Sequence, residues 1–310
     1  MADLLERVRA TGLLPEGAAV VVLLSSGRDS VCLMDCAVRL AGVQAVHALY
    51  VDHGLRVEAA GDEEHCRELC ARLGVELTIV RARRPQGPGN LHAWAREARY
   101  AAAYRVAQEN AALVATGHTA SDQAETVLYR LAASPGRRAL LGMAAREDGL
   151  VRPLLGVTRA QTAAHCAARG LSWREDASND DPAFARARVR GGLLPAMATI
   201  HPAAEANVVR TAALLREEAA VLDGLVAEAL APHGDRITLE RLGTLPAALA
   251  RLVLRRMAEE TTGRLCPRAA GRLEEVLALG EGAIDLGEGA RATLRDGVVT
   301  VGRTPPRPVR

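Results

Sequence analysis

Three polar stretches of this sequence each follow an apolar run, and together their residue types could bind a phosphorylated ligand and a cation. The first is the segment SSGRDS, residues 25–30. Small residues between a strand and a helix let backbone N–H groups approach phosphate oxygens closely. The carboxylate of Asp29 would repel a bare phosphate, so it predicts a cation such as Mg²⁺ beside the phosphate. The alternative is that Asp29 and Ser30 only cap a helix.

The second stretch, VDHGLR, places Asp52, His53 and Arg56 after another apolar run. These side chains could border a bound ligand. The stretch could equally be a turn in which Gly54 adopts a positive φ.

The third stretch, GHTASDQAETVLYRL, has His118 at the end of an apolar run and two acids on the helix that follows. Asp122 and Glu125 are three residues apart, so they share a helix face and could bind one cation or one ammonium group. The alternative is structural, because Thr119 and Asp122 have the spacing of a capping box and acids suit a helix N-terminus.

These stretches need a framework that brings strand ends together, and the apolar runs predict one. The expected strands are Ala19–Leu24, Val43–Val51, Val75–Val80 and Leu113–Thr116, and the expected helices are Ser30–Ala41, Glu58–Leu73, Leu91–Asn110 and Asp122–Ala132. Strands that alternate with helices predict an α/β fold with a Rossmann-like parallel sheet. Ligands of such sheets bind beyond the carboxyl ends of the strands, where the polar stretches lie.

The rest of the chain has a different pattern. Residues 134–192 are irregular and rich in Arg, and a long amphipathic helix is expected after Pro202. Two further helices, Pro246–Glu260 and Pro267–Ala278, precede small β-hairpins with turns at Gly287–Gly289 and Asp296–Gly297. We therefore expect a domain of residues 1–200 and a smaller, mostly helical domain of residues 201–310.

The composition excludes some chemistries. All 39 basic residues are Arg. A Walker A loop needs Lys on the phosphates and Schiff-base catalysis needs a Lys amine, so both are excluded. The net charge of +2 excludes a polycation, so an acidic partner would have to meet a local basic patch.

The cysteines and the apolar runs predict a cytoplasmic protein. Six cysteines occur, at positions 32, 36, 66, 70, 166 and 266, and none forms a CxxC pair. We interpret them as small buried hydrophobic residues in a reducing cytosol, and not as disulfides or metal ligands. No apolar run approaches the ~18 residues of a membrane span, and the N-terminal segment lacks a signal core.

Several motifs carry a resemblance to a known family. The loop SSGRDS resembles the PP-loop of N-type ATP pyrophosphatases, and it is shared with several other synthetases. The segments VDHGLR, GNLHAWAREARY, GHTASDQAETVLYRL and WREDASNDDPAFARARVR, in this order, resemble the tRNA(Ile)-lysidine synthetases. The resemblance covers residues 15–200 well, and after that only the helical and hairpin character is similar.

The resemblance implies a ligase that joins lysine to the wobble cytidine of tRNA(Ile) with a CAU anticodon. ATP would first adenylate the base with loss of pyrophosphate, and the lysine amine would then displace AMP. The implied cofactors are ATP and Mg²⁺, the implied partners are this tRNA and L-lysine, and a homodimer stays open.

The resemblance also implies roles for particular residues. The loop residues Ser25, Ser26, Gly27, Arg28, Asp29 and Ser30 would bind the β- and γ-phosphates of ATP, and Asp29 would also bind Mg²⁺. Asp52 and His53 would border the nucleotide. Asp122 and Glu125 would bind the lysine amines or a metal, with His118 beside them. The arginines implied for phosphate or RNA contacts are Arg99, Arg186, Arg188 and Arg190, and the sequence does not decide which of the last three enters the site.

The sequence departs from the family pattern at four positions. Ser26 replaces the first Gly of the loop, Ser121 an Asp, Ala187 an Asn, and His92 a common acid. The Cβ of Ser26 is expected to disfavour a positive φ or to crowd the phosphates. Two rival interpretations are therefore kept: a tRNA cytidine 2-thiolation enzyme, which the lack of CxxC disfavours, and a catalytically silent RNA- or nucleotide-binding protein, which Ser26 favours.

Overall fold

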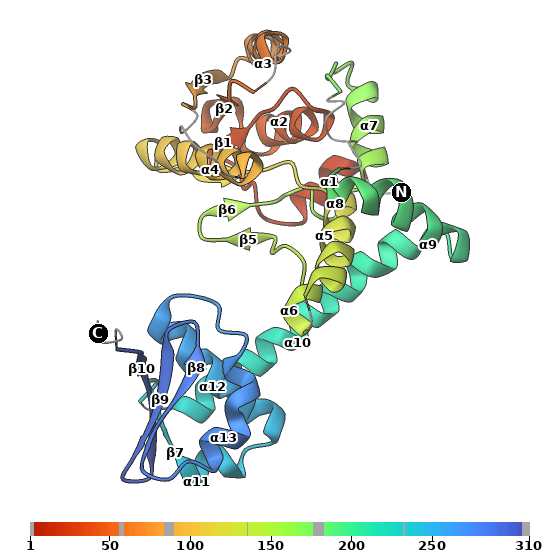
Figure 1. The fold of residues 1–310 in the computed structure, drawn as a ribbon. Helices are drawn as coiled ribbons and strands as arrows, with labels where there is room; N and C mark the ends of the chain where they lie inside the picture. Colours follow the sequence, from red (N-terminus) through yellow and green to blue (C-terminus); the bar gives the residue numbers. More distant parts are fainter. Residues whose placement is uncertain are drawn as a thin grey trace. The chain divides into compact units, whose positions relative to one another are not determined.

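The computed structural model describes residues 3–55, 59–83, 90–134, 136–175, 183–231 and 233–305. The chain divides into two compact units, Met1–Ala213 and Leu214–Arg310 (Figure 1). The first unit contains a mostly parallel sheet, and the second contains an antiparallel sheet. The predicted fold class is confirmed. Among the described residues, no helix is long and apolar enough to cross a membrane.

The sheet of the first unit has the strand order β3-β2-β1-β4-β6-β5. Its strands are β1 (Val20–Leu23), β2 (Val46–Asp52), β3 (Glu76–Arg81), β4 (Leu113–Ala115), β5 (Arg146–Glu147) and β6 (Leu150–Val151). All pairs are parallel except that of β5 with β6 at the edge. Because β2 and β4 flank β1 in parallel register, the three polar stretches begin at the same edge of the sheet.

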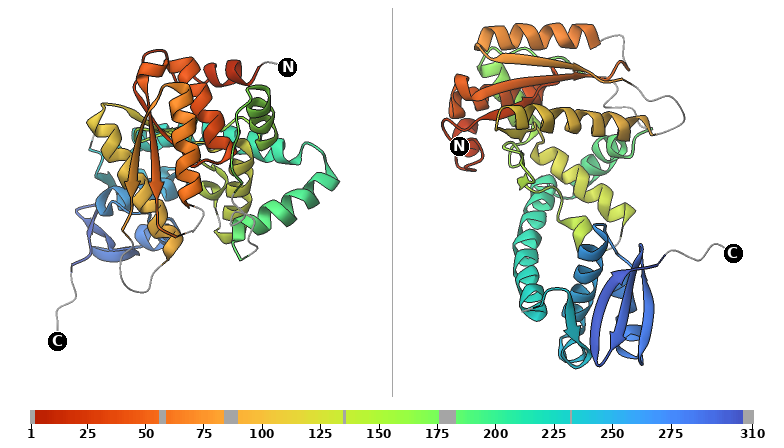
Figure 2. Two further views of the ribbon diagram at one scale, coloured as in Figure 1. Left: turned by 90° about the horizontal axis from the view of Figure 1, so that it is seen from above. Right: turned by 90° about the vertical axis from the view of Figure 1, so that its left-hand side faces the viewer.

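Helices cover both faces of this sheet, and Figure 2 shows α3 and α4 on opposite sides of it. Helices α2 (Arg28–Ala41) and α3 (Ala59–Leu73) share a core with Val20 and Val22 of β1. Helix α4 (Leu91–Glu109) shares another core with Val21 and Leu23. Successive side chains of a strand point to opposite faces, so a strand covered on both faces is a continuous apolar run.

The four strands and four helices expected before residue 134 are confirmed with shifted ends. The second strand begins at Val46 and not at Val43, because residues Val43–Ala45 form the 3₁₀ turn η1. Helix α5 (Ala120–Ala133) begins two residues earlier than expected. A short helix, α1 (Leu4–Arg9), precedes β1.

The expectation of an irregular segment at residues 134–192 is wrong in part. This segment contains α6 (Arg137–Leu140), α7 (Arg159–Ala168), α8 (Ala185–Arg188) and the π-helical turn η3 (Val189–Leu193), which α9 (Leu194–Ile200) follows. Helix α7 begins with a capping box, in which the Thr158 hydroxyl accepts a hydrogen bond from the Gln161 N–H and the Gln161 side chain accepts one from the Thr158 N–H. The motif TRAQ was therefore a helix signal in the sequence.

The long helix expected after Pro202 is confirmed as α10 (Ala204–Leu230), which begins in the first unit and continues into the second. The second unit also contains β7 (Arg236–Thr238), α11 (Leu239–Thr244), α12 (Ala247–Thr262), η4 (Ala269–Arg272), α13 (Leu273–Leu277), β8 (Gly282–Gly287), β9 (Ala290–Arg295) and β10 (Val298–Arg303). The expected hairpin turns lie between β8, β9 and β10, whereas β7 and the break between η4 and α13 were not predicted. The strand order is β7-β10-β9-β8, and Leu254, Met257 and Leu286 are fully buried in this unit's core.

The loop after β4 passes very close to the start of α2 at Gly117. A Cβ at this position would lie 2.9 Å from the carbonyl carbon and oxygen of Asp29 and 3.0 Å from the Ser30 nitrogen. Only glycine therefore permits the close approach of these two segments.

We expect Gly117→Ala to separate the loop from α2 and to lower the free energy of unfolding by about 1–3 kcal/mol, as other overpacked substitutions do. Urea unfolding measures this change, and nucleotide affinity should fall with it. Gly156→Ala is the matched control, because a Cβ there has nothing within 4 Å. Equal stability of the two variants would contradict the close packing.

Candidate active site

The loop between β1 and α2 is held by its own side chains. The Ser30 hydroxyl donates to the carbonyl oxygen of Gly27 at 2.8 Å and accepts a hydrogen bond from the Ser25 N–H at 3.1 Å. Gly27 is the N-cap residue of α2 and has no side chain with which to cap the helix. The first N–H groups of α2 can therefore face a ligand, as in other anion sites at helix N-termini.

Ser26 adopts the left-handed conformation that its Cβ was expected to disfavour, with φ of 57°. Its hydroxyl is buried and donates to Oδ1 of Asp62 at 3.0 Å, an oxygen that also accepts from Nε of Arg174 at 2.8 Å. The backbone N–H of Arg174 donates to the Ser26 carbonyl oxygen. A left-handed residue costs about 1–2 kcal/mol, and the net gain of about 1 kcal/mol from a hydrogen bond offsets part of this.

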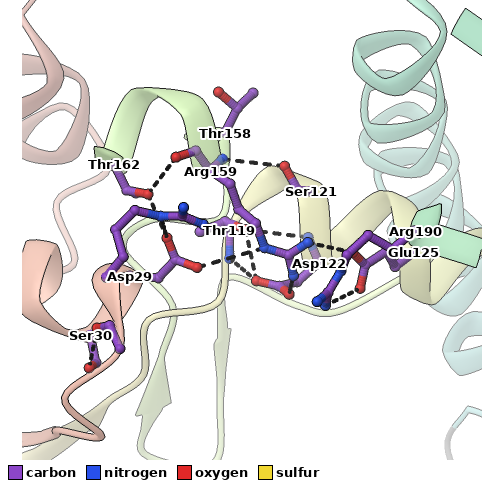
Figure 3. Close-up of polar contacts among 12 residues, drawn as sticks. Asp29, Ser30, Thr119, Ser121, Asp122, Glu125, Thr158, Arg159, Thr162 and Arg190 are labelled. Atoms are coloured by element: carbon purple, nitrogen blue, oxygen red, sulfur yellow. Dashed lines mark hydrogen bonds and ion pairs between the residues drawn. The ribbon is translucent and has the colours of Figure 1, made fainter. Parts of the chain in front are cut away.

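Arg159, at the start of α7, joins three carboxylates from two other helices, as Figure 3 shows. Its guanidinium donates to Oδ1 of Asp122 and, at 2.5 Å, to Oε1 of Glu125. Its Nε lies 3.8 Å from Oδ2 of Asp29. The carboxylates beside Arg159 raise the pKa of its guanidinium despite burial, so Arg159 stays charged. Sequence reasoning missed Arg159, although the capping box marked the helix that carries it.

Glu125 is the most buried acid of this group, with 1% of its surface exposed. A second guanidinium compensates its charge: Arg190 donates from Nε to Oε1 at 2.8 Å and from Nη2 to Oε2 at 3.2 Å. Arg190 lies in η3, whereas Arg188 in α8 donates to the carbonyl oxygen of Ala183. Arg190 therefore contacts the cluster of Asp29, Asp122 and Glu125, which is called the acidic cluster below.

Asp122 caps helix α5, as its structural interpretation predicted, and it also pairs with Arg159. Its Oδ2 accepts hydrogen bonds from the N–H and the hydroxyl of Thr119, at 2.8 and 2.7 Å, which completes the capping box of α5. Its Oδ1 pairs with Arg159. Burial opposes ionisation, but Arg159 and the Thr119 hydrogen bonds lower the pKa of Asp122. One oxygen thus caps the helix while the other faces the site.

His118 lies beside this cluster and shares a hydrogen bond of 2.8 Å between its Nδ1 and the hydroxyl of Thr116. Burial lowers its pKa to about 4, although Asp122 acts in the opposite direction. The imidazole is therefore neutral at pH 7 and adds no positive charge to the site.

Asp29 is poised for an oxygen-binding cation. Its Oδ1 accepts a hydrogen bond from the Thr162 hydroxyl of α7, and Nε of Arg28 lies 3.3 Å away. The carboxylate of Asp29 is a ligand that Mg²⁺ accepts, since this ion commonly binds one or two carboxylates together with substrate phosphates.

The remaining predicted residues make other contacts. Asp52 accepts a hydrogen bond from the N–H of Gly54, whose φ of 63° confirms the turn interpretation. The His53 ring meets Trp94 edge-on, with centroids 5.8 Å apart. Arg99 lies on α4, where burial lowers the pKa of its guanidinium, and none of the described polar contacts of the acidic cluster involves it. Arg56, residues 176–182 and the side chain of His92 lie outside the described residues.

Ser121, which stands where the family pattern has an acid, connects two other helices to the site. Its hydroxyl donates to Oε1 of Glu205 in α10 at 2.6 Å and accepts a hydrogen bond from the N–H of Arg159 at 3.3 Å. The hydroxyl therefore helps to fix the helix turn from which the Arg159 side chain extends.

The fold and the loop together define a PP-loop ATP-binding domain, and residues 4–197 match the PP-loop domain family. The tRNA(Ile)-lysidine synthase of Mycolicibacterium paratuberculosis is 38% identical over 297 residues, 92% of this chain and 91% of that protein. That of Symbiobacterium thermophilum is 37% identical, over 98% of this chain and 70% of its own length. The chain belongs to the tRNA(Ile)-lysidine synthase family, so the predicted family membership is confirmed.

Two other comparisons concern the length of the chain and its fold. The chain spans only 61% of the length of the tRNA(Ile)-lysidine synthase of Solibacter usitatus, which is 39% identical over 274 residues. A solved U34-tRNA thiolase from Methanococcus maripaludis shares the fold, with a TM-score of 0.58 at 18% identity, over 69% of this chain and 78% of that one. This second likeness concerns the fold alone.

We expect Arg159→Ala to lower the free energy of unfolding by about 3 kcal/mol, because it removes the guanidinium partner of Asp122 and leaves the buried Glu125 with Arg190 alone. Urea unfolding of the whole chain measures the loss. Arg105→Ala removes an exposed arginine of α4 and should leave stability unchanged within about 0.5 kcal/mol. If the two variants unfold at the same urea concentration, the Arg159 pairing does not stabilise the fold.

Ser26→Gly and Ser26→Ala should differ in stability although both lose the hydroxyl. Glycine relieves the left-handed strain and alanine keeps it, so we expect the alanine variant to be about 1 kcal/mol less stable. Thermal unfolding of both variants checks this. Identical melting curves would mean that residue 26 does not hold a positive φ in solution.

The buried, neutral His118 should make stability depend on pH. Its folded pKa lies below the unfolded value near 6.5, so the unfolded state binds more protons between pH 6.5 and 4, and stability falls on acidification. From pH 7 to pH 5 we expect wild type to lose about 2 kcal/mol more than His118→Gln. Urea unfolding at both pH values gives this difference, and parallel losses would contradict a depressed pKa.

Proposed function

We propose that this protein joins L-lysine to the wobble cytidine of a tRNA(Ile) with a CAU anticodon and converts ATP to AMP and pyrophosphate. The observation that carries the proposal is the arrangement of Asp122, Glu125 and Arg159 beside a PP-loop. Family membership and identities of 37–39% to proteins named tRNA(Ile)-lysidine synthase support it. Because the chain is shorter than several of these relatives, the whole activity is a proposal.

In the first step, the C2 oxygen of the cytidine would attack the α-phosphorus of ATP, and pyrophosphate would leave. The residues proposed to hold the β- and γ-phosphates are Ser25, Ser26, Gly27, Arg28, Asp29 and Ser30. The N–H groups at the start of α2 supply partial positive charge toward the leaving group. Asp29 would hold Mg²⁺, which would supply charge neutralisation on the phosphates. Asp52 and His53 would border the nucleotide.

In the second step, the ε-amine of lysine would attack C2 of the adenylated base, AMP would leave, and the attacking nitrogen would lose a proton. Asp122 and Glu125 are the proposed contacts for the ammonium groups of the incoming lysine. Arg159 already compensates these carboxylates, so a lysine cation would take over part of the pairing that Arg159 supplies. Neutral His118 would not repel that cation.

The tRNA would be bound in part by arginines of residues 1–200. Arg190, Arg99 and the exposed arginines near α8 are proposed for contacts to phosphate or RNA. Residues 1–200 would form the catalytic domain and residues 201–310 the tRNA-binding domain. A cytoplasmic location is a further prediction, and a homodimer is left open.

The decisive experiment is incorporation of labelled lysine into a CAU-anticodon tRNA(Ile) transcript, with ATP and Mg²⁺. A transcript with uridine at the wobble position is the substrate control. Incorporation into the first transcript alone is the expected outcome. A folded protein that binds the tRNA but incorporates no lysine would contradict the proposal and favour the silent RNA-binding interpretation.

Variants separate the two substrate sites. We expect Asp122→Asn to raise the KM for lysine at least tenfold, because one ion pair is worth about 1.4 kcal/mol or more in a buried site, while the KM for ATP changes less. Asp29→Asn should instead abolish pyrophosphate release. Asp235→Asn, an exposed aspartate of the second unit, is the control. Equal effects of Asp122→Asn on both substrates would count against a lysine contact.

A further inference from the structure

A cluster of buried sulfur and nitrogen ligands lies between α2 and α7, behind the acidic cluster. The side chains of Cys32, Cys36 and His165 each offer one ligand atom, and these atoms all lie within 4.8 Å of one another. Both cysteines are fully buried, and His165 is 8% exposed. Among the described residues, this is the one group of three or more His, Cys, Asp or Glu side chains whose ligand atoms lie within 4.8 Å of one another.

The two helices bring these ligands together from distant parts of the chain. Cys32 and Cys36 are four residues apart on α2, so their side chains project from the same face of that helix. Helix α7 packs on this face and carries His165 followed by Cys166. The Cys166 thiol lies within hydrogen-bonding reach of Cys32 and donates to the carbonyl oxygen of Arg28 at 3.7 Å.

A buried carboxylate orients the imidazole. Asp35, also on α2, shares a hydrogen bond of 2.8 Å between its Oδ2 and Nε2 of His165. Asp35 is itself 1% exposed, and Arg169 lies 3.4 Å from its Oδ1. Metal-binding histidines commonly give one ring nitrogen to a carboxylate, which fixes the ring and strengthens the other nitrogen as a ligand. Asp35 would give the site this kind of support if Nδ1 of His165, the nitrogen that does not contact Asp35, is the ligand atom.

We propose that Cys32, Cys36 and His165 bind one Zn²⁺ ion, with the thiol of Cys166, which follows His165 on α7, as the proposed fourth ligand. Thiolate sulfur and imidazole nitrogen are the ligands that zinc prefers, and four-coordinate sites of cysteine and histidine are usually structural. Two thiolates would neutralise the ion, so its burial would leave no net charge on the three-ligand site. This proposal departs from the sequence interpretation, in which all cysteines are only small hydrophobic residues.

The thiols need a cation in order to ionise. Zinc binds the thiolate form of cysteine, so the buried thiols of Cys32 and Cys36 would have to lose their protons on binding. Zinc binding would therefore release protons and weaken on acidification.

The proposed zinc site would link α2 and α7, the two helices that carry Asp29, Arg159 and Thr162. Helix α2 begins with Asp29, and α7 carries Arg159 and Thr162 within its first turn. The Thr162–Asp29 hydrogen bond joins these helices near their N-terminal ends, and the metal would join them one turn further along. Zinc would thus stabilise the register of α7 on α2 and would take no part in the chemistry.

The test uses the full-length protein purified without chelators and measures bound zinc by mass spectrometry. We expect about one zinc per chain and, after exchange with Co²⁺, sulfur-to-cobalt charge-transfer absorption together with the d–d bands of a tetrahedral site. Cys36→Ser should lose the metal or bind it at least tenfold more weakly. Cys70→Ser is the matched control, because Cys66 and Cys70 are buried with the same spacing on α3 and have no third ligand among the described residues.

Several outcomes would overturn the proposal. These are the absence of zinc with no cobalt–sulfur absorption, an equal loss of metal in Cys36→Ser and Cys70→Ser, or the absorption of an iron–sulfur cluster. If Cys36→Ser does not fold, the wild-type cobalt spectrum still decides, since only sulfur ligation produces the charge-transfer bands. Metal content is read independently of lysine incorporation, so this proposal can fail while the proposed function stands.

Discussion

The ion pairs of Arg159 are the interaction on which the site depends. Asp122 and Glu125 are held side by side on α5, and Asp29 faces them from α2. Without a cation between them, burial and mutual repulsion would raise their pKa values and favour protonation. Arg159 supplies that cation from a third helix, so the carboxylates stay ionised and fixed in geometry. The three carboxylates are thereby preformed around a cationic side chain.

The rest of the first unit serves to bring those helices to one place. Parallel strands covered on both faces put their carboxyl ends at one edge, where the PP-loop and the loop before α5 begin. Gly117 allows these two loops to approach more closely than any residue with a Cβ could. Ser121 and Thr162 add hydroxyl bridges from α5 and α7. The proposed zinc site would hold α7 on α2 behind this arrangement.

In the PP-loop, Ser26 replaces a glycine of the family pattern, and the structure accommodates this replacement. The Cβ of Ser26 was expected to disfavour a positive φ or to crowd the phosphates, but the residue adopts a φ of 57°. The hydrogen bond from Ser26 to Asp62, which Arg174 also contacts, offsets part of the strain. Ser26 therefore supports the silent-binder interpretation less than the sequence suggested, because its Cβ does not prevent a positive φ.

The sequence by itself determined the features that repeat over short distances: the buried strands, the helices between them, the positions of Asp29, His118 and Asp122 at strand ends, and the family. Tertiary structure alone decided which groups meet. Arg159 lies 34 residues from Glu125 and Thr162 lies 133 residues from Asp29. No periodic pattern encodes such pairs, because they depend on how helices pack after the sheet has formed. For the same reason, the sequence did not decide between Arg186, Arg188 and Arg190, nor did it place His165 beside two cysteines.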